Sequence, residues 1–385
     1  MFATRLVDLP EAVASYRDAM IRLTRELVAI PSENPPGNCY PETVELLSRR
    51  LRELGFDDTR IEGDCVLSFV GEGPRTLYFS GHYDVVPAQS RSQFEPEVKG
   101  ANLFGRGSSD MKSGLAAMTY AALALREAGC LKDGRIGLVF VPDEETAGPR
   151  GSRYLADRGL LGIDAIGMLT PEPTGGVIWN GNRGAITLKI TVKGKSAHVG
   201  RQHEGINAFE RMLTVARSLQ TLKSAVETAQ RSILMLGGRT EGGANFNVVP
   251  EYCSFTVDRR INPDEDFDKE KRRLLDVLEK ERVAGIDLDV EVLQEGRSCR
   301  VAEDGPVGRA LAQAVEEVTG RTPKFEMCPG LLEIRFYAER EIPAFAYGPG
   351  LLSVSHGPNE FVPVANIVEC AQVYALTGSQ LLGRR

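Results

Sequence analysis

The sequence predicts an α/β protein in which one α/β domain is interrupted by an inserted α+β domain. Apolar strand candidates alternate with helical patterns over residues 1–183, which is typical of α/β folds. From residue 184 the strands become alternately apolar and polar, and after about residue 295 the α/β pattern returns. The 385 residues are enough for two or three domains.

The first part of the chain combines helices with strands that have two apolar faces. Helical patterns cover about residues 11–29 and 41–54, and an Ala-rich helix is predicted over Ser113–Ala128, ended by Gly129. A run such as Ile136–Val141 is apolar on both faces, which is typical of strands buried in a parallel sheet. Strands are predicted over residues 65–70, 76–80, 135–141 and 164–169.

The inserted segment has the pattern of a different domain. Ile186, Leu188, Ile190 and Val192 alternate with polar residues, so this strand needs only one buried face. The predicted order β-α-β-β-α-β matches a split-βαβ, ferredoxin-like domain, here over residues 184–294. Its further elements are expected at about 204–220, 230–236, 247–259, 264–283 and 286–293, and the flanking domain ends with elements at about 305–319, 343–347 and from 364.

Composition excludes several classes of function. The chain has 46 Lys+Arg and 53 Asp+Glu, a net charge of −7, and no basic run, so neither nucleic acid nor a membrane surface is the expected partner. Met1–Met20 is charged throughout and lacks the apolar segment of a secretion signal. The seven cysteines are scattered and never form C-x-x-C, which favours reduced thiols. We expect a cytoplasmic protein.

Two histidines follow predicted strands. His82 follows the strand at 76–80, and Asp84, two residues later, can accept the second imidazole N–H and so orient a metal ligand. A histidine in an ordinary turn remains the alternative for this motif alone. His356 lies in Ser355–Glu360, after the last predicted strand.

Carboxylates follow the other strands of the same predicted sheet. Asp110 precedes the Ala-rich helix, where it could instead cap that helix. Glu144 and Glu145 follow the strand at 135–141, where a solvated acidic loop is the alternative, and Glu172 stands between two prolines. Imidazoles and carboxylates gathered at one sheet edge suit two zinc ions or a related divalent pair, with a carboxylate between them.

These ordered motifs resemble those of one family over nearly the whole chain. The family is that of the co-catalytic zinc peptidases and deacylases, with acetylornithine deacetylase, succinyl-diaminopimelate desuccinylase, aminoacylase and the glutamate carboxypeptidases. The resemblance implies a catalytic domain (1–183 and 295–385) with a zinc-peptidase-like mixed sheet and an inserted dimerisation, or lid, domain. The motifs are Gly81–Asp84, Gly105–Gly114, Asp143–Gly148, Glu172–Thr174, Ser196–His198 and Ser355–Glu360.

The resemblance also implies the roles of individual residues. One metal would bind to His82, Asp110 and Glu172, and the other to Asp110, Glu145 and His356, so that Asp110 bridges the two. Glu144 would be the general base, and a free carboxylate beside a metal pair suits that task. Asp84 would orient His82. Zinc is expected, with cobalt or manganese as possible substitutes.

Three residues of the inserted domain complete the implied site. In the family, the histidine matching His198 reaches the active site of the partner subunit and stabilises an oxyanion, which implies a homodimer formed through the inserted domain. Asn247 and Arg260 match residues that bind the substrate's α-carboxylate, a task suited to guanidinium. The sequence does not decide between Arg260 and its neighbour Arg259, and an ion pair with Asp258 remains the alternative for either.

We therefore expect a di-metal amidohydrolase that cleaves an N-acyl amino acid or short peptide next to a free carboxylate. In Cys328–Arg335 the residues Leu332, Glu333 and Ile334 replace the small polar groups usual in desuccinylases, which leaves a dipeptidase or carboxypeptidase as an alternative. A catalytically inactive metal-binding protein is the alternative of another class, and the intact Glu144 argues against it. A dinucleotide-dependent redox enzyme is not favoured, because no G-x-G-x-x-G opens a helix after the first strand.

Overall fold

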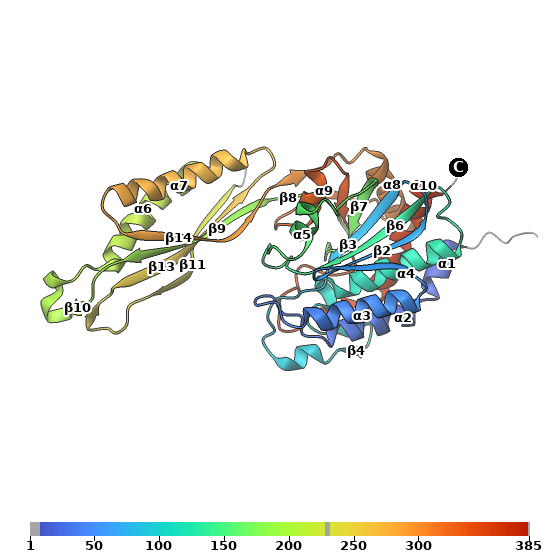
Figure 1. The fold of residues 1–385 in the computed structure, drawn as a ribbon, viewed down its shortest axis with the longest axis horizontal. Helices are drawn as coiled ribbons and strands as arrows, with labels where there is room; N and C mark the ends of the chain where they lie inside the picture. Colours follow the sequence, from blue (N-terminus) through green and yellow to red (C-terminus); the bar gives the residue numbers. More distant parts are fainter. Residues whose placement is uncertain (1–7, 228–231, 384–385) are drawn as a thin grey trace, which may run out of the picture. The chain divides into compact units, whose positions relative to one another are not determined.

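The computed structural model describes residues 8–227 and 232–383 (Figure 1). The chain divides into two compact units, each with its own core. Unit 1 contains residues 1–181, 300–328 and 332–385, and unit 2 contains residues 182–299 together with 329–331. The inserted segment thus runs from Asn182 to Cys299, against the predicted 184–294.

Unit 1 is built on a mixed sheet, in which nine strands are found among the described residues. Their order is β1-β2-β6-β3-β7-β17-β8-β15, and β16 pairs with β8. The central strands β6, β3, β7 and β17 are parallel, whereas β1, β2 and β8 are antiparallel to their neighbours. The strands are β1 (Asp58–Glu62), β2 (Cys65–Glu72), β3 (Thr76–His82), β6 (Gly134–Val141), β7 (Ala165–Thr170), β8 (Ile178–Asn182), β15 (Cys299–Arg300), β16 (Phe325–Cys328) and β17 (Ala344–Ala346).

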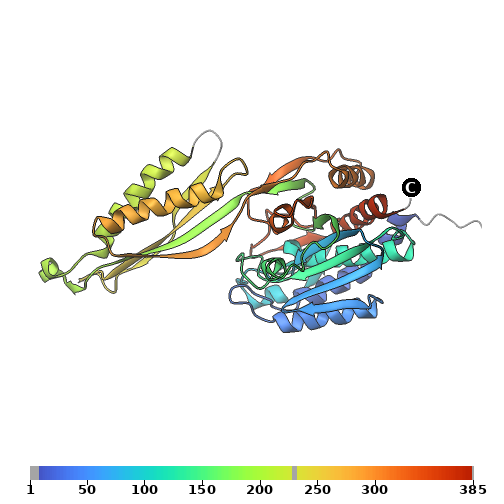
Figure 2. The same ribbon diagram turned by 45° about the horizontal axis from the view of Figure 1, so that its top comes forward.

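Helices cover both faces of this sheet (Figures 1 and 2). Successive side chains of a strand point to opposite faces, and in β3 the ring of Phe79 packs 4.8 Å from Tyr374 while Tyr78 packs 5.9 Å from Tyr337. Tyr374 belongs to α10 and Tyr337 to α9, so these two helices lie on opposite faces. The helices are α1 (Leu9–Ala14), α2 (Arg17–Val28), α3 (Tyr40–Glu53), α4 (Ser113–Glu127), α5 (Ser152–Asp157), α8 (Pro306–Thr319), α9 (Ile334–Ala338) and α10 (Val364–Leu382).

The strand β3 and the helix α4 are buried because neither sequence has a polar face. Every residue of β3 is buried, as the sequence predicts for a strand with two apolar faces. The small residues of α4 allow it to pack closely against α10 and the sheet, and all of its first seven residues are buried. A small three-stranded sheet of β4 (Glu97–Lys99), β5 (Asn102–Phe104) and β18 (Phe361–Pro363) joins the segment before α4 to the segment before α10.

Unit 2 is the predicted split-βαβ domain. Four of its strands form an antiparallel sheet in the order β11-β13-β9-β14, and α6 and α7 cover one face (Figure 2). The short strands β10 and β12 pair with each other in a separate sheet. The alternating residues of β9 explain this, because Ile186, Leu188, Ile190 and Val192 all enter the core. The elements are β9 (Gly184–Lys193), β10 (Ala197–His198), α6 (Ala208–Val226), β11 (Ile233–Gly242), β12 (Val248–Val249), β13 (Tyr252–Ile261), α7 (Phe267–Val283) and β14 (Leu288–Gly296).

The predicted fold class is confirmed, but several element boundaries were wrong. The helix expected at 11–29 is divided into α1 and α2, with the break at Ser15 and Tyr16. The strand expected at 247–259 is divided at Pro250, which has no N–H to give to a strand ladder. The strand expected at 230–236 corresponds to β11, and residues 230 and 231 lie outside the described residues.

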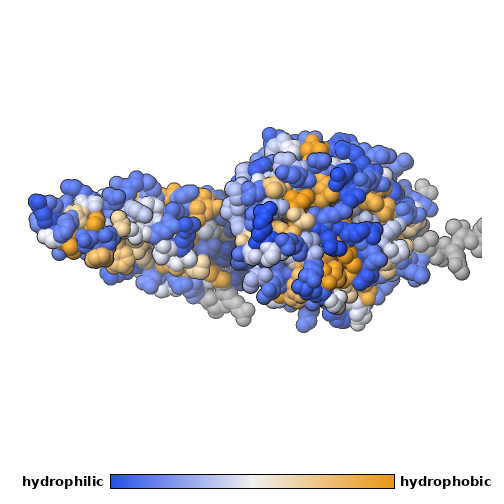
Figure 3. Space-filling view, turned by 90° about the horizontal axis from the view of Figure 1, so that it is seen from below, coloured by the Kyte–Doolittle hydropathy of each residue, from blue (hydrophilic) through white to orange (hydrophobic). Residues whose placement is uncertain are grey.

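The visible surface carries both hydrophilic and apolar residues. In Figure 3, hydrophilic residues cover much of the visible face, and apolar residues lie between them in small groups. Within residues 8–227 and 232–383, no helix has the length and apolar character needed to cross a membrane.

Candidate metal centre

The parallel strands of unit 1 bring the predicted metal ligands to one edge of the sheet. β3, β6, β7 and β17 run in the same direction, so their carboxyl ends lie side by side. His82 is the last residue of β3, and Glu172 stands two residues beyond β7. Glu144 and Glu145 follow β6, and His356 follows β17.

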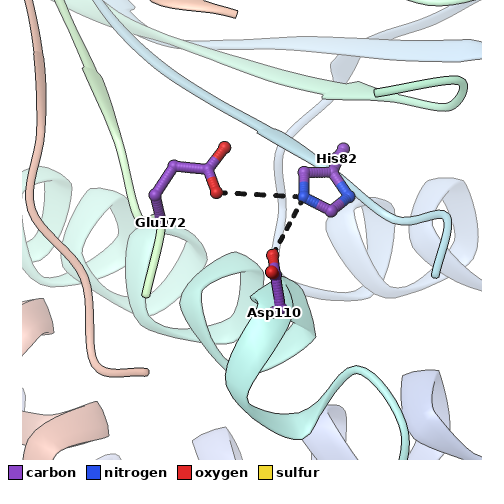
Figure 4. Close-up of side chains that lie close together, drawn as sticks. All are labelled: His82, Asp110 and Glu172. Atoms are coloured by element: carbon purple, nitrogen blue, oxygen red, sulfur yellow. Dashed lines mark ion pairs between the residues drawn. The ribbon is translucent and has the colours of Figure 1, made fainter. Parts of the chain in front are cut away.

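One group of side chains consists of His82, Asp110 and Glu172. Figure 4 shows these side chains pointing toward one another from three separate segments. The Nε2 atom of His82 lies 3.3 Å from Oδ1 of Asp110 and 4.0 Å from Oε2 of Glu172. All three residues are buried, and one donor atom from each lies within 4.8 Å of the others.

A second group consists of Asp110, Glu145 and His356. The Nε2 atom of His356 lies 3.3 Å from Oδ2 of Asp110 and 3.2 Å from Oε2 of Glu145. Asp110 therefore belongs to both groups, and its two oxygens face different imidazoles. This arrangement is the one expected of a carboxylate that bridges two cations.

Buried atoms without partners indicate that the site fits metal ions. Among the described residues, Nε2 of His82, Oε1 of Glu145 and Oε1 of Glu172 are buried and make no hydrogen bond. Buried polar atoms are normally paired, so unpaired ligand atoms in the same pocket need an explanation. Imidazole and carboxylate donors at these spacings suit divalent transition metals such as zinc.

The electrostatics of the site also favour cations. Burial raises the pKa of Glu172 to about 8, and burial likewise raises the pKa values of Glu144 and Glu145. Hydrogen bonds to Asp110 and Glu145 raise the pKa of His356 to about 11. Burial works against ionisation of Asp110, but the imidazoles of His356 and His82, each 3.3 Å from one of its oxygens, lower its pKa overall. Divalent ions would relieve this crowding of buried carboxylates.

Asp84 organises the site from behind His82. Its Oδ1 atom lies 3.4 Å from Nδ1 of His82, and that nitrogen is also 3.0 Å from the Asp84 carbonyl oxygen. The same carboxylate accepts hydrogen bonds from the amide N–H groups of Glu144 (3.3 Å) and Glu145 (3.2 Å) and from the side-chain amide of Asn34 (2.9 Å). Asp84 thus contacts both the imidazole of a candidate ligand and the acidic loop after β6.

Glu144 belongs to neither group of candidate ligands. Its Oε2 atom lies 4.0 Å from Nε2 of His82, so it stands beside the metal pocket while Glu145 enters it. The preceding residue, Asp143, has a left-handed φ of 65° and accepts a hydrogen bond of 2.8 Å from the Tyr40 hydroxyl. Glu145 is a member of a candidate ligand group, whereas its neighbour Glu144 is not.

Sequence reasoning missed several residues that support the site. The side-chain amide of Asn34 donates hydrogen bonds to Asp84 and Thr146. The carboxylate of Glu360 accepts a hydrogen bond from the backbone amide of Asp110. Glu333 is buried near the pocket, where burial raises its pKa to about 7. The motif Ser355–Glu360 was visible in the sequence, but only the fold shows which partners Glu360 meets.

The remaining predicted residues lie in unit 2. His198 pairs with Val248 across β10 and β12, and Asn247 accepts a hydrogen bond from Val199 through its carbonyl, so His198 and Asn247 are neighbours. The side chain of His198 is exposed, and its Nδ1 atom accepts a hydrogen bond of 3.1 Å from Gly200.

The two candidate arginines of β13 have different environments. Arg259 is buried and forms ion pairs with Glu265 and Glu270, so its role is structural. Arg260 is 27% exposed and forms the ion pair with Asp258 that the sequence left as an alternative, with N–O distances of 2.6 and 3.0 Å. Of the two, only Arg260 is accessible to a ligand.

Comparison with known proteins identifies relatives that match more than nine tenths of the chain. Residues 78–379 match the model of peptidase family M20/M25/M40. The succinyl-diaminopimelate desuccinylase of Parvibaculum lavamentivorans is 30% identical over 378 residues, covering 91% of this chain and 92% of that protein. The desuccinylase of Gluconacetobacter diazotrophicus is 28% identical over 383 residues, covering 94% and 97%.

Solved structures share the fold. An M20 family metallo-carboxypeptidase from Sulfolobus solfataricus has a TM-score of 0.82 at 17% identity, covering 94% of this chain and 98% of that one. The di-peptidase Dug1p of Saccharomyces cerevisiae has a TM-score of 0.79 at 16% identity, covering 98% of both chains. The family match spans the strands and loops that supply His82, Asp110, Glu145, Glu172 and His356. The chain is therefore a metal-dependent hydrolase of amide bonds and a member of peptidase family M20/M25/M40.

Proposed function

We propose that this protein uses two divalent metal ions to hydrolyse an N-acyl amino acid or short peptide next to a free carboxylate. Zinc is the metal we favour for both positions. The observation that carries the proposal is the pair of ligand groups sharing Asp110, with Glu144 beside them and outside both. Cobalt or manganese could replace zinc, because the same imidazole and carboxylate donors bind those ions. His82, Asp110 and Glu172 would hold one ion, and Asp110, Glu145 and His356 the other.

The residues of this chain divide the reaction between them. When bound, the metal pair supplies Lewis acidity to the scissile carbonyl and to water. Glu144 accepts the proton of the attacking water at its carboxylate and returns it to the departing amine. Asp84 keeps Nε2 of His82 directed into the pocket, because its carboxylate and its carbonyl both face Nδ1.

We propose that two residues of unit 2 select the substrate. Asn247 and Arg260 would bind the free carboxylate of the substrate, and the planar guanidinium suits a two-point contact. Arg260 already forms a two-point ion pair with Asp258, so substrate has to compete with that carboxylate.

Two kinds of acyl group are candidates for the substrate. The relatives of highest identity given above are named desuccinylases, which favours a dicarboxylic acyl group. The segment Cys328–Arg335 favours a dipeptide or C-terminal peptide, because Leu332, Glu333 and Ile334 replace the small polar groups usual in desuccinylases. Both reactions use the same metal pocket and base.

We also propose that the enzyme is a cytoplasmic homodimer formed through unit 2, with His198 acting on the partner subunit's substrate. The exposed position of His198 supports this, because it stands at the protein surface rather than within a core. Its imidazole would donate to the oxyanion of the tetrahedral intermediate.

The test of the proposed function is a substrate screen with purified protein. Acetyl-, succinyl- and aminoacyl-substituted amino acids are assayed with zinc, with cobalt and after chelation, and release of the free amino acid is measured. We expect one acyl class to be hydrolysed only when metal is present. Two bound metal equivalents with no hydrolysis of any class would instead support the inactive metal-binding protein.

A further inference from the structure

The loop that carries Asp110 closes around a buried carboxylate, that of Glu360. The Oε1 atom of Glu360 accepts hydrogen bonds of 3.0 Å from three backbone amides, those of Gly107, Ser109 and Asp110. Successive amides that converge in this way form a small anion-binding concavity. Only 1% of the Glu360 side chain is exposed, so this carboxylate belongs to the interior of the loop.

The other oxygen of Glu360 pairs with Arg106, and Arg106 reaches a second metal ligand. The Arg106 guanidinium is likewise 1% exposed. Its Nη2 atom donates to the carbonyl oxygen of His356 (3.1 Å) and to the side-chain oxygen of Gln89 (2.9 Å). Gln89 in turn donates to the same His356 carbonyl at 3.0 Å.

His356 needs such support more than His82 does. His82 ends a strand whose ladder fixes its backbone, and Asp84 faces its ring. His356 lies in a loop, has a left-handed φ of 65°, and is 50% exposed at its side chain. Its backbone carbonyl is held by Arg106 and Gln89 instead of by a strand.

We propose that Glu360 and Arg106 are positioning residues that fix Asp110 and His356 together and so set the affinity of the second metal position, formed by Asp110, Glu145 and His356. The proposal rests on the proposed function, because it assumes that both ligand groups hold metal. Glu360 and Arg106 should therefore affect metal affinity more strongly at this second position than at the position formed by His82, Asp110 and Glu172.

The key variant is Glu360→Gln, which keeps the size of the side chain. An amide has one oxygen and one NH2 group, so it must present N–H groups either to the three loop amides or to Arg106. Partners that orient metal ligands typically contribute about 10–100-fold to metal affinity. We therefore expect one of the two zinc equivalents to bind about 10–100-fold more weakly, and the other to change much less.

Two further variants keep the test decisive. Gln89→Ala changes an exposed residue, removes one hydrogen bond to His356 and cannot disturb the core. The same zinc equivalent should therefore lose affinity, but by a smaller factor than in Glu360→Gln. Glu265→Gln is the matched control, because Glu265 also pairs with a buried arginine and accepts a backbone amide, but in unit 2. This control should bind both equivalents as the wild type does.

The measurement is zinc bound at equilibrium in buffers of defined free zinc, together with the visible absorption spectrum of the cobalt-loaded proteins. Equal weakening of both equivalents in Glu360→Gln would overturn the proposal, and so would unchanged zinc binding. If Glu360→Gln does not fold, unchanged binding in Gln89→Ala overturns it. A wild-type protein that binds no second equivalent contradicts the proposed function itself, which separates the two failures.

Discussion

The carboxylate of Asp84 accepts a hydrogen bond of 3.3 Å from the backbone amide of Glu144. Because the same carboxylate faces Nδ1 of His82, the candidate base and a candidate metal ligand have one anchor in common. A change at Asp84 should therefore affect metal binding and proton transfer together, which distinguishes it from a change at either of its partners.

Asp84→Asn tests this common anchor. The amide cannot accept from His82, Asn34 and the Glu144 loop as the charged carboxylate does, so the imidazole loses its orientation. We expect metal affinity to fall about 10–100-fold and kcat to fall even at saturating metal. Chelator competition and steady-state kinetics measure the two effects. Asp64→Asn, which alters an ion pair with the partly exposed Arg150, is the control.

Glu144→Ala separates catalysis from metal binding. Glu144 lies outside both ligand groups, so its removal should leave both metal equivalents in place. Loss of a general base lowers turnover by about 100-fold or more. Metal analysis and kcat measured on the same preparation check both halves of the prediction. Turnover within a few-fold of wild type would remove Glu144 from the mechanism.

A mixture of two inactive variants tests whether His198 acts across a dimer. His198→Ala keeps Glu144, and Glu144→Ala keeps His198, so a mixed dimer regains one complete site if His198 serves the partner. Random 1:1 pairing of the subunits gives roughly a quarter of wild-type activity, because about half of the dimers are mixed and each has one complete site. No recovery after co-expression contradicts action in trans. His203→Ala, an exposed histidine nearby, should remain active.

The pKa shifts predict proton release when metal binds. In the metal-free protein the pKa of Glu172 is about 8 and that of His356 is about 11, so at pH 7 both groups are mainly protonated. Metal ligands must lose these protons, so metal affinity should rise as the pH is raised from 6 toward 8. Calorimetry in buffers of different ionisation enthalpy counts the released protons. Binding enthalpies that do not depend on the buffer would contradict the prediction.

The candidate metal ligands could be predicted because the chain marks them locally. His82 ends an apolar strand, and Glu172 stands between two prolines shortly after another, so strand order and direction alone place them at one edge. The boundary errors have local causes too. The helical pattern continues across Ser15, and only the geometry shows α1 and α2 as separate helices.

By itself the sequence determined the fold class, the inserted domain and the candidate ligand set, because hydrophobic periodicity and strand-end chemistry are local properties. The tertiary structure decided which of two adjacent arginines is structural, since burial of Arg259 between Glu265 and Glu270 depends on packing between distant elements. It also decided that Glu360 and Arg106 join Asp110 to His356. Such contacts link residues about 250 positions apart, and no local pattern encodes them.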